Sequence, residues 1–325
     1  IDREEVLALA EFAAVATVGD IMELTGENRI LVRYGLKRLE QTKNPGYRAL
    51  IRANGLEGKR LTAYHIGFVI GPCINASGRL DTAKRALMLL GAKEQREAEI
   101  LAGDLKALND SRKALTLKGT EEAKRQIEET DRKEDRVLVV YLEDCHESLA
   151  GIIAGRIREC YYRPCFILTD GEEGVKGSGR SIEGYHMFDE MTRVRELFTR
   201  YGGHPMAAGL SMERGKVEEL RRRLNENCLL TKEDLVPKQC YDAVLPISYA
   251  GEQLIRELEL LEPFGKGNEK PLFAAGNLLV KSARIIGKNA NVLKLMLEDE
   301  NGFRMEALSF GDVRGDLEYI EGKER

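Results

Sequence analysis

Tryptophan is absent from the 325-residue sequence, and no stretch approaches the ~18 consecutive apolar residues that a membrane-spanning helix needs. No basic segment followed by an apolar one opens the chain, so no secretory leader is indicated. Because the composition is otherwise that of an ordinary soluble protein, we expect a cytoplasmic protein with no membrane partner.

The cysteines lack any CxxC spacing, which argues against a zinc knuckle. They are scattered among apparent core segments, which argues against a disulfide framework, so we expect reduced thiols. The six are Cys73, Cys145, Cys160, Cys165, Cys228 and Cys240.

An excess of positive charge is also missing, since 50 Lys and Arg residues stand against 54 Asp and Glu, a formal net charge of −4. Proteins that bind nucleic acid through phosphate contacts usually show a basic domain or stripe. Any nucleic-acid site in this chain must therefore be local.

The chain is too long for a single core, and two or three domains are expected. Helical periodicity appears near residues 4–16, 28–42 and 83–90, with a polar link that carries Asp20 and a Gly-rich passage, GFVIGPCINASGRL, between them. From residue 93 to 135 charges dominate, yet apolar residues keep a seven-residue rhythm, which predicts one long helix bridging two lobes. A solvated helical hairpin inside one domain is the alternative.

The pattern of apolar and polar residues changes twice in the second half of the chain. RVLVVYL, a helix near residues 149–160 and PCFILTD read as strand, helix and strand with short connections, which predicts an α/β lobe. A further helix is expected near residues 186–199. After Pro237, short strand-like pieces alternate with glycine or polar turns, which predicts a small β-barrel.

Two Gly-rich motifs in the α/β lobe are candidates for anion binding. In GGHPMAAG, Gly202 and Gly203 let backbone N–H groups approach an anion, and His204 can donate to a phosphate oxygen. In GSGRS, Ser178 offers a hydroxyl and Arg180 a planar fork suited to phosphate. Two such motifs in one lobe predict a shared pocket, whereas each alone is also compatible with a tight turn.

Two further motifs lie in the first ninety residues. Asp20 follows an apolar run and is a candidate metal ligand, with a helix cap as the alternative. No neighbouring residues form a ligand cluster, so a divalent site would need partners from elsewhere. GPCINASGRLD carries Arg79 in an expected helix-leading loop, which can bind phosphate or shape its own turn.

These motifs, in this order over nearly all of the chain, resemble the RecJ family of single-strand-specific exonucleases in the DHH phosphoesterase superfamily. ATVGDIMELTGENRILVRYGLKRL is similar to the last metal-binding motif of the DHH domain, and IGPCINASGRLDTA to the Asn and Gly-Arg element after it. HESLAGIIAGRI is similar to the opening of the DHH-associated domain, whose signature GSGRS and GGHPMAAG resemble. LEPFGKGNEKPLF is similar to the segment that leads into the family's oligonucleotide-binding barrel.

The resemblance implies an α/β fold in four parts: the C-terminal part of a DHH lobe (1–92), a bridging helical linker (93–134), an α/β DHH-associated domain (135–232) and an OB-type β-barrel (233–325). It implies a 5′→3′ exonuclease of single-stranded DNA in repair and recombination, in which two Mn²⁺ or Mg²⁺ ions activate water. The barrel would grip the strand. A monomer is expected, with DNA repair proteins as further candidate partners.

The family's site residues carry over by position. Asp20 would be a catalytic metal ligand. The phosphate path would be lined by Arg79, Ser178, Arg180, Gly202, Gly203 and His204.

The chain departs from the family pattern in several places. It starts after the place where the Asp-His-His triplet would stand, so we expect a fragment that lacks most metal ligands and is inactive alone. Cys73 stands where the family commonly has arginine, and Cys145 replaces a tryptophan before His146. The barrel looks truncated near Arg325.

Two other functions stay open. A phosphodiesterase for short oligoribonucleotides or cyclic dinucleotides shares the two lobes but lacks the barrel. A scaffold that has lost catalysis would hold single strands or partner proteins in replication or repair.

Overall fold

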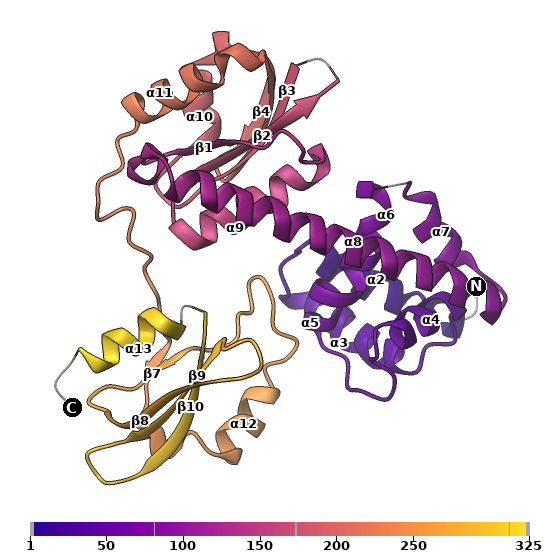
Figure 1. The fold of residues 1–325 in the computed structure, drawn as a ribbon. Coiled ribbons are helices and arrows are strands. Elements are labelled where there is room, and N and C mark those ends of the chain that lie inside the picture. The colour runs from indigo at the N-terminus through magenta and orange to yellow at the C-terminus, as the bar shows by residue number, and fades with distance from the viewer. Residues whose placement is uncertain (1–2, 81, 173, 312, 323–325) are drawn as a thin grey trace. The chain divides into compact units, whose positions relative to one another are not determined.

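A computed structural model describes residues 3–80, 82–172, 174–311 and 313–322. The residues group into two compact units. The first comprises Ile1–Glu11 and Gly35–Lys238, and the second comprises Phe12–Tyr34 and Gln239–Arg325. Figure 1 labels the elements of both units.

The first ninety residues are mostly helical, as the periodicity predicts, but the helix expected at residues 4–16 is divided into two. Asn44 illustrates the local cause of one start, because its side chain accepts from the Tyr47 N–H just before Pro45 opens a helix. The elements are α1 (Arg3–Ala8), α2 (Ala10–Gly19), α3 (Gly26–Glu40), α4 (Pro45–Ala53), α5 (Ala63–His65), the π-helix η1 (Ile66–Ile70), α6 (Gly71–Leu80) and α7 (Lys84–Gly91).

The Gly-rich passage GFVIGPCINASGRL is helical, not the expected loop. It forms η1 and then α6, whose small residues permit close packing: a Cβ added at Gly71 would meet the Ile66 carbonyl oxygen at 2.8 Å. Cys73, Ala76 and Ser77 are fully buried. Small residues therefore serve helix packing here, because α6 lies against the long helix α8.

The predicted bridging helix is α8 (Gln95–Glu128), a continuous helix of 34 residues that spans about 50 Å at the usual rise. Its continuity excludes the helical hairpin. Its N-terminal part packs against α4, α6 and α7, and its C-terminal part packs against α9 and β1. The buried stripe runs through Ala102 and Leu105 and continues through polar Asn109 and Thr120, whereas Leu115 is 45% exposed.

Among the described residues of the α/β lobe, a five-stranded sheet forms in the order β1-β2-β3-β5-β4. β1 and β2 are parallel and are joined through α9, while the other pairs are antiparallel. Buried clusters lie on both faces of the sheet. The elements are β1 (Leu138–Tyr141), α9 (Glu147–Tyr161), β2 (Cys165–Gly171), β3 (Gly174–Arg180), α10 (Met187–Thr192), β4 (Phe198–His204), β5 (Ala207–Met212) and α11 (Val217–Asn227).

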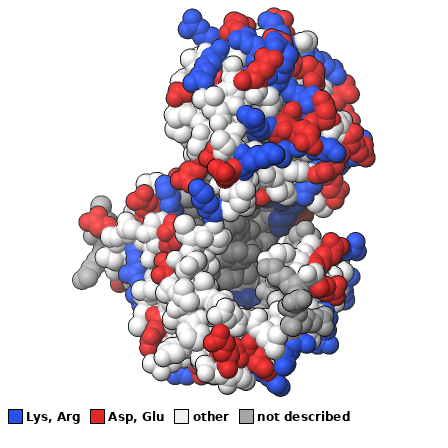
Figure 2. Space-filling model, turned by 90° about the vertical axis from the view of Figure 1, so that its left-hand side faces the viewer, with Lys and Arg blue, Asp and Glu red and all other residues white. Residues whose placement is uncertain are grey.

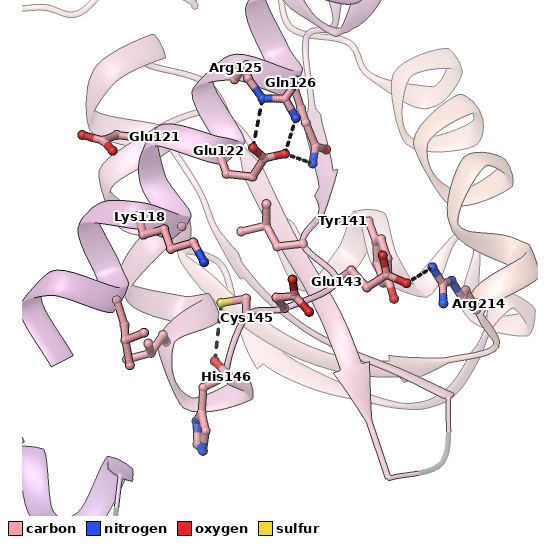
Figure 3. A pocket seen from close by; sticks show the side chains of 15 residues that line it. Lys118, Glu121, Glu122, Arg125, Gln126, Tyr141, Glu143, Cys145, His146 and Arg214 are labelled. Atoms are coloured by element: carbon pink, nitrogen blue, oxygen red, sulfur yellow. Dashed lines mark hydrogen bonds and ion pairs between the residues drawn. The ribbon is translucent and has the colours of Figure 1, made fainter. Parts of the chain in front are cut away.

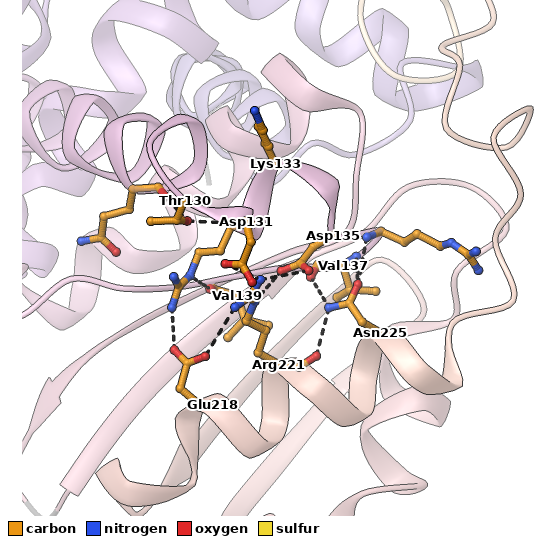
Figure 4. A network of polar contacts seen from close by, with 12 residues as sticks. Thr130, Asp131, Lys133, Asp135, Val137, Val139, Glu218, Arg221 and Asn225 are labelled. Atoms are coloured by element: carbon orange, nitrogen blue, oxygen red, sulfur yellow. Dashed lines mark hydrogen bonds and ion pairs between the residues drawn. The ribbon is translucent and has the colours of Figure 1, made fainter.

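A network of polar contacts holds the segment after α8 against α11 (Figure 4). The Arg221 guanidinium contacts Asp135 at 2.6 Å and Asp131 at 3.0 Å. The Asn225 side chain accepts from the Val137 N–H at 3.0 Å and donates to the Val137 carbonyl at 2.9 Å. These bonds fix where the chain leaves α8 and begins β1, so they set the register of the sheet edge.

The second unit contains the strands after Pro237. Within its described part, β8 (Leu279–Ile286), β9 (Val292–Glu298) and β10 (Arg304–Phe310) form an antiparallel sheet, and β6 (Ala243–Val244) pairs in parallel with β7 (Phe273–Ala274). Two helices accompany them, α12 (Glu252–Glu259) and α13 (Val313–Glu321).

The segment between α2 and α3 belongs to this second unit. The Leu24 N–H donates to the Lys266 carbonyl at 2.7 Å, and Arg29 donates to the Leu260 carbonyl at 3.1 Å. No helix in the described part of the chain combines the length and apolar character that crossing a membrane requires.

Candidate anion-binding site

Ser178 and Arg180 lie on β3, on the sheet face that α9 covers. Arg180 Nη1 donates to Ser178 Oγ at 3.1 Å and to the Gly179 carbonyl at 2.7 Å. A Cβ added at Gly151 of α9 would meet Arg180 Nη2 at 2.8 Å and Ser178 Oγ at 3.0 Å. The absence of a side chain at Gly151 therefore makes room for the guanidinium between the helix and the strand.

The two glycines of GSGRS, Gly177 and Gly179, face the opposite side of β3. A Cβ at Gly177 would meet Leu168 Cδ2 at 2.2 Å, and a Cβ at Gly179 would meet Met187 Sδ at 2.4 Å. Successive residues of a strand point to opposite faces, so the glycines face the core while Ser178 and Arg180 face α9. The motif therefore combines close core packing with a polar face, and it forms no turn.

Arg79, on the last turn of α6, reaches the N-terminus of α9. Its Nη1 donates to the Ser148 carbonyl at 3.0 Å. Burial lowers the pKa of Arg180, and the positive charges of Arg79 and Arg158 lower it further. The pKa of Arg112 on α8 is lowered by burial and then by the charges of Arg79 and Arg156.

These arginines come from α6, α8, α9 and β3, and they form the cluster that we call the arginine site: Arg79, Arg112, Arg156, Arg158 and Arg180. Among the residues that the structure describes, no carboxylate contributes to the pKa of Arg112 or Arg180. Arg112 and Arg180 are partly buried, and like charges in such a position raise the free energy of the site, so a bound anion would stabilise it. Arg79 and Arg156 are exposed, and Arg158 contacts the Glu159 carboxylate at 2.9 Å. Guanidinium groups suit phosphate, because their planar forks match its oxygens.

Three arginines of the site escaped the motif analysis. Arg112 lies one turn after the buried Asn109 on α8, and Arg156 and Arg158 lie on α9 on either side of the buried Ile157. A charged residue beside a buried helical stripe was the available signal. The predicted site residues were taken from Gly-containing motifs, so these three arginines were not among them.

Gly202, Gly203 and His204 lie on β4, an edge strand, so they do not form the tight turn that was the alternative to an anion site. Ser178 pairs with Gly209 of β5, which pairs with Gly202, so Gly202 lies two strand spacings, about 10 Å, from Ser178. Successive N–H groups of a strand point in opposite directions, so the N–H groups of Gly202 and Gly203 do not converge on one point. The role of these glycines in phosphate binding stays a prediction. A Cβ at Gly203 would meet the Ala207 carbonyl oxygen at 2.4 Å, which explains this glycine by packing against β5.

His204 shapes the β4–β5 connection. Its Nδ1 accepts from the Met206 N–H at 3.3 Å, and the exposed ring keeps Nε2 for a ligand. Its predicted role in phosphate binding stays a prediction.

Asp20 follows α2, and its N–H donates to the Ala16 carbonyl at 2.9 Å. Asp20 therefore lies at the C-terminal end of α2 and not at the N-terminus of the next helix, which begins only at Gly26. Its role as a metal ligand stays a prediction. Across the described ranges, no group of three or more His, Cys, Asp or Glu residues could hold a metal ion. Asp20 belongs to the second unit, whereas the arginine site belongs to the first. These residues do not by themselves fit a two-metal centre.

A hollow of about 630 Å³ lies between α8 and the loop after β1, apart from the arginine site (Figure 3). Two ion pairs lie among the residues that line it, Arg214 with Glu143 at 3.0 Å and Arg125 with Glu122 at 2.7 Å. Lys118 extends from α8 toward the loop that carries Cys145, whose thiol pKa is raised by burial. The hollow contains none of the predicted phosphate residues.

The face of the molecule drawn in Figure 2 is mixed in charge. On the face drawn in Figure 2, Lys and Arg side chains alternate with Asp and Glu, and neither sign forms a broad stripe. The local character of the site therefore agrees with the net charge of −4.

Comparison with known proteins supports the order of the motifs. The family model for the DHHA1 domain matches residues 134–229, and the model for the RecJ OB domain matches residues 241–324. The single-stranded-DNA-specific exonuclease RecJ of Bacillus subtilis is 34% identical over 325 residues, covering 97% of this chain and 41% of the relative. RecJ of Escherichia coli is 35% identical over 309 residues, covering 90% of this chain and 52% of the relative.

Solved structures of RecJ are also similar to this chain. The crystal structure of RecJ from Thermus thermophilus in complex with Mn²⁺ superimposes with a TM-score of 0.81 at 33% identity, covering 94% of this chain and 45% of that chain. The Mg²⁺ complex gives a TM-score of 0.80. The chain thus spans about half or less of the curated relatives and solved structures just described. It belongs to the RecJ family, with a DHHA1 domain in its first unit and a RecJ OB domain in its second.

Proposed function

We propose that this chain serves the 5′→3′ hydrolysis of single-stranded DNA, and that the arginine site binds a phosphate of the unpaired strand. The observation that carries this proposal is the pair of partly buried guanidinium groups of Arg112 and Arg180, which have Arg79 as a charged neighbour and no counter-charge among the described residues. Arg180 and Ser178 would contact phosphate oxygens from β3 and Arg79 from α6. His204, Gly202 and Gly203 would line the path farther along the sheet.

The second unit supports a nuclease over a phosphodiesterase for short oligoribonucleotides or cyclic dinucleotides. Phosphodiesterases of that kind lack the barrel, whereas residues 241–324 match the RecJ OB domain. OB domains bind single strands through a basic groove and base stacking.

Mn²⁺ and Mg²⁺ occur in the similar RecJ structures, and we propose the same metals for this activity. When bound, such ions activate water and stabilise the charge of the transferred phosphoryl group. Asp20 is the one carboxylate predicted to contribute, so most ligands would come from outside the described residues and the chain alone would be inactive. We further propose a cytoplasmic monomer that binds DNA repair proteins. The domain boundaries expected from the sequence are proposed with one change, because residues 12–34 group with the second unit.

The test is fluorescence anisotropy of a labelled oligodeoxythymidylate that carries a 5′ phosphate, with Arg180→Ala and the matched control Arg222→Ala. A charge-assisted hydrogen bond contributes ~1.5–3 kcal/mol, so Arg180→Ala should weaken binding about tenfold or more. Arg222 is an exposed arginine of the same lobe, on α11, and its loss should leave affinity unchanged. Equal affinity of Arg180→Ala and the wild type would refute the phosphate role of the site.

A further inference from the structure

A directional chain of hydrogen bonds runs from α4 through α6 to α8. It starts where Asn54, which caps the C-terminus of α4, donates from Nδ2 to the Leu50 carbonyl at 2.8 Å. The Cys73 thiol donates to Asn54 Oδ1 at 3.7 Å, and Asn109 Nδ2 donates to Cys73 Sγ at 3.4 Å. The chain ends at Arg112, whose Nε and Nη2 donate to Asn109 Oδ1 at 3.2 and 2.9 Å.

The direction of this chain follows from the chemistry of its last member. Arginine offers only donors, so Asn109 must turn Oδ1 toward Arg112 and its NH₂ group toward Cys73. The sulfur then accepts from Asn109 and has its S–H left to donate to Asn54. Rotating the Asn109 amide by half a turn would set donors against donors at the guanidinium.

Burial makes the arrangement costly to break. Cys73 is fully buried and Asn109 is 1% exposed, so neither can exchange its partner for water. Burial also raises the pKa of the Cys73 thiol, which keeps the S–H donor present at neutral pH.

A neutral acceptor orients Arg112 without cancelling its charge. Arg221 differs in this respect. It joins α11 to the segment after α8 and is held by the carboxylates of Asp131 and Asp135, which cancel its charge. Arg112 is held by the neutral amide oxygen of Asn109 instead. Its described hydrogen bonds use Nε and Nη2, so Nη1 can donate to another acceptor. Its charge remains directed at the arginine site, where Arg79 and Arg156 are its charged neighbours.

We infer that Arg112 is a phosphate-binding residue of the arginine site and that Asn54, Cys73 and Asn109 form its positioning relay. The inference rests on the proposed function and extends it to residues outside both Gly-rich motifs. The relay links the helical part of the first unit to phosphate binding, because α4, α6 and α8 all contribute to the orientation of one guanidinium.

The test uses the 325-residue chain and the labelled 5′-phosphorylated oligodeoxythymidylate, titrated at several salt concentrations. Arg112→Gln should weaken binding about tenfold and reduce the slope of log K against log salt by about 0.7, the value for one phosphate contact on a single strand. Asn109→Asp retains the size and the acceptor but neutralises the guanidinium, so it should show the same change in slope. A purely structural role would leave the slope unchanged.

Substitutions at Cys73 test the relay itself. Cys73→Ser can donate and accept in the same directions and should bind within about twofold of the wild type, whereas Cys73→Val should weaken binding severalfold. Arg180→Ala separates the two proposals. Loss of affinity in Arg180→Ala with unchanged affinity and slope in Arg112→Gln would overturn this inference alone, and unchanged affinity in Arg180→Ala would overturn the proposed function. If the Asn109 or Cys73 variants fail to fold, the slope of Arg112→Gln still decides.

Discussion

Replacing Arg221 by alanine should destabilise the α/β lobe strongly. Its guanidinium makes a bidentate contact with Asp135, from Nε at 2.6 Å and from Nη2 at 3.2 Å, and a further contact with Asp131 at 3.0 Å. The side chains of Arg221 and Asp135 are only 15% and 14% exposed. The variant would therefore leave the Asp135 carboxylate largely buried without its counter-ion.

Removing one partner of a buried ion pair costs about 3–5 kcal/mol. Water can reach Asp135 through the cavity that the shortened side chain leaves, so we expect the lower end of that range, about 3 kcal/mol. With a urea dependence of ~1.5–2 kcal/mol per molar for a domain of this size, the unfolding midpoint should fall by about 1.5–2 M.

The neighbouring arginine supplies a matched control. Arg222 lies on the same helix and contacts Glu219 and Glu226, both at 2.6 Å, but its side chain is 54% exposed. Exposed pairs contribute little, so Arg222→Ala should leave the midpoint unchanged. Urea titrations followed by circular dichroism compare the two variants, and similar midpoints would refute the claim that burial of the Arg221 network stabilises the lobe.

Three further predictions concern the space beside Gly151, the burial of Glu11 and the burial of Cys165. Gly151→Ala should weaken binding of the phosphorylated oligonucleotide in anisotropy titrations, because the new Cβ displaces Arg180, whereas Gly155→Ala on the same helix meets open space and should not. Burial raises the pKa of Glu11, so the folded state binds its proton more tightly than the unfolded chain and stability falls as the pH rises from about 4.5 through the raised pKa. Glu11→Gln should therefore have a higher urea midpoint than the wild type at pH 8 but not at pH 4, and equal shifts at both would contradict the assignment. Complete burial raises the pKa of the Cys165 thiol, which should react with Ellman's reagent only in urea; rapid reaction of a Cys165-only variant in buffer would contradict its burial.

Local chemistry explains why the sequence predicted the α/β lobe. RVLVVYL and PCFILTD are continuous apolar runs of strand length, and they became the parallel strands β1 and β2 because both faces of a parallel sheet are buried. The long helix was equally visible, since no proline interrupts Gln95–Glu128.

The glycines show the limit of motif reasoning. Gly202 and Gly203 were interpreted as openings for an anion, yet only Gly202 has open space beside it, because atoms of Ala207 and Ala208 fill the space beside Gly203. A glycine that accommodates a phosphate and one that accommodates a leucine look the same in a sequence. Only the position of the opposing atoms distinguishes them.

The sequence by itself determined the order of the domains and two of the charged groups of the arginine site, Arg79 and Arg180, because apolar periodicity and short motifs are local properties. The tertiary structure alone decided that Arg112 joins them and that Asn109 and Cys73 orient it. Those residues lie on separate helices, and hydrogen bonds between helices depend on how the helices pack, which no local pattern encodes. Burial then gives the contacts their strength, because water cannot replace a partner inside the packed core.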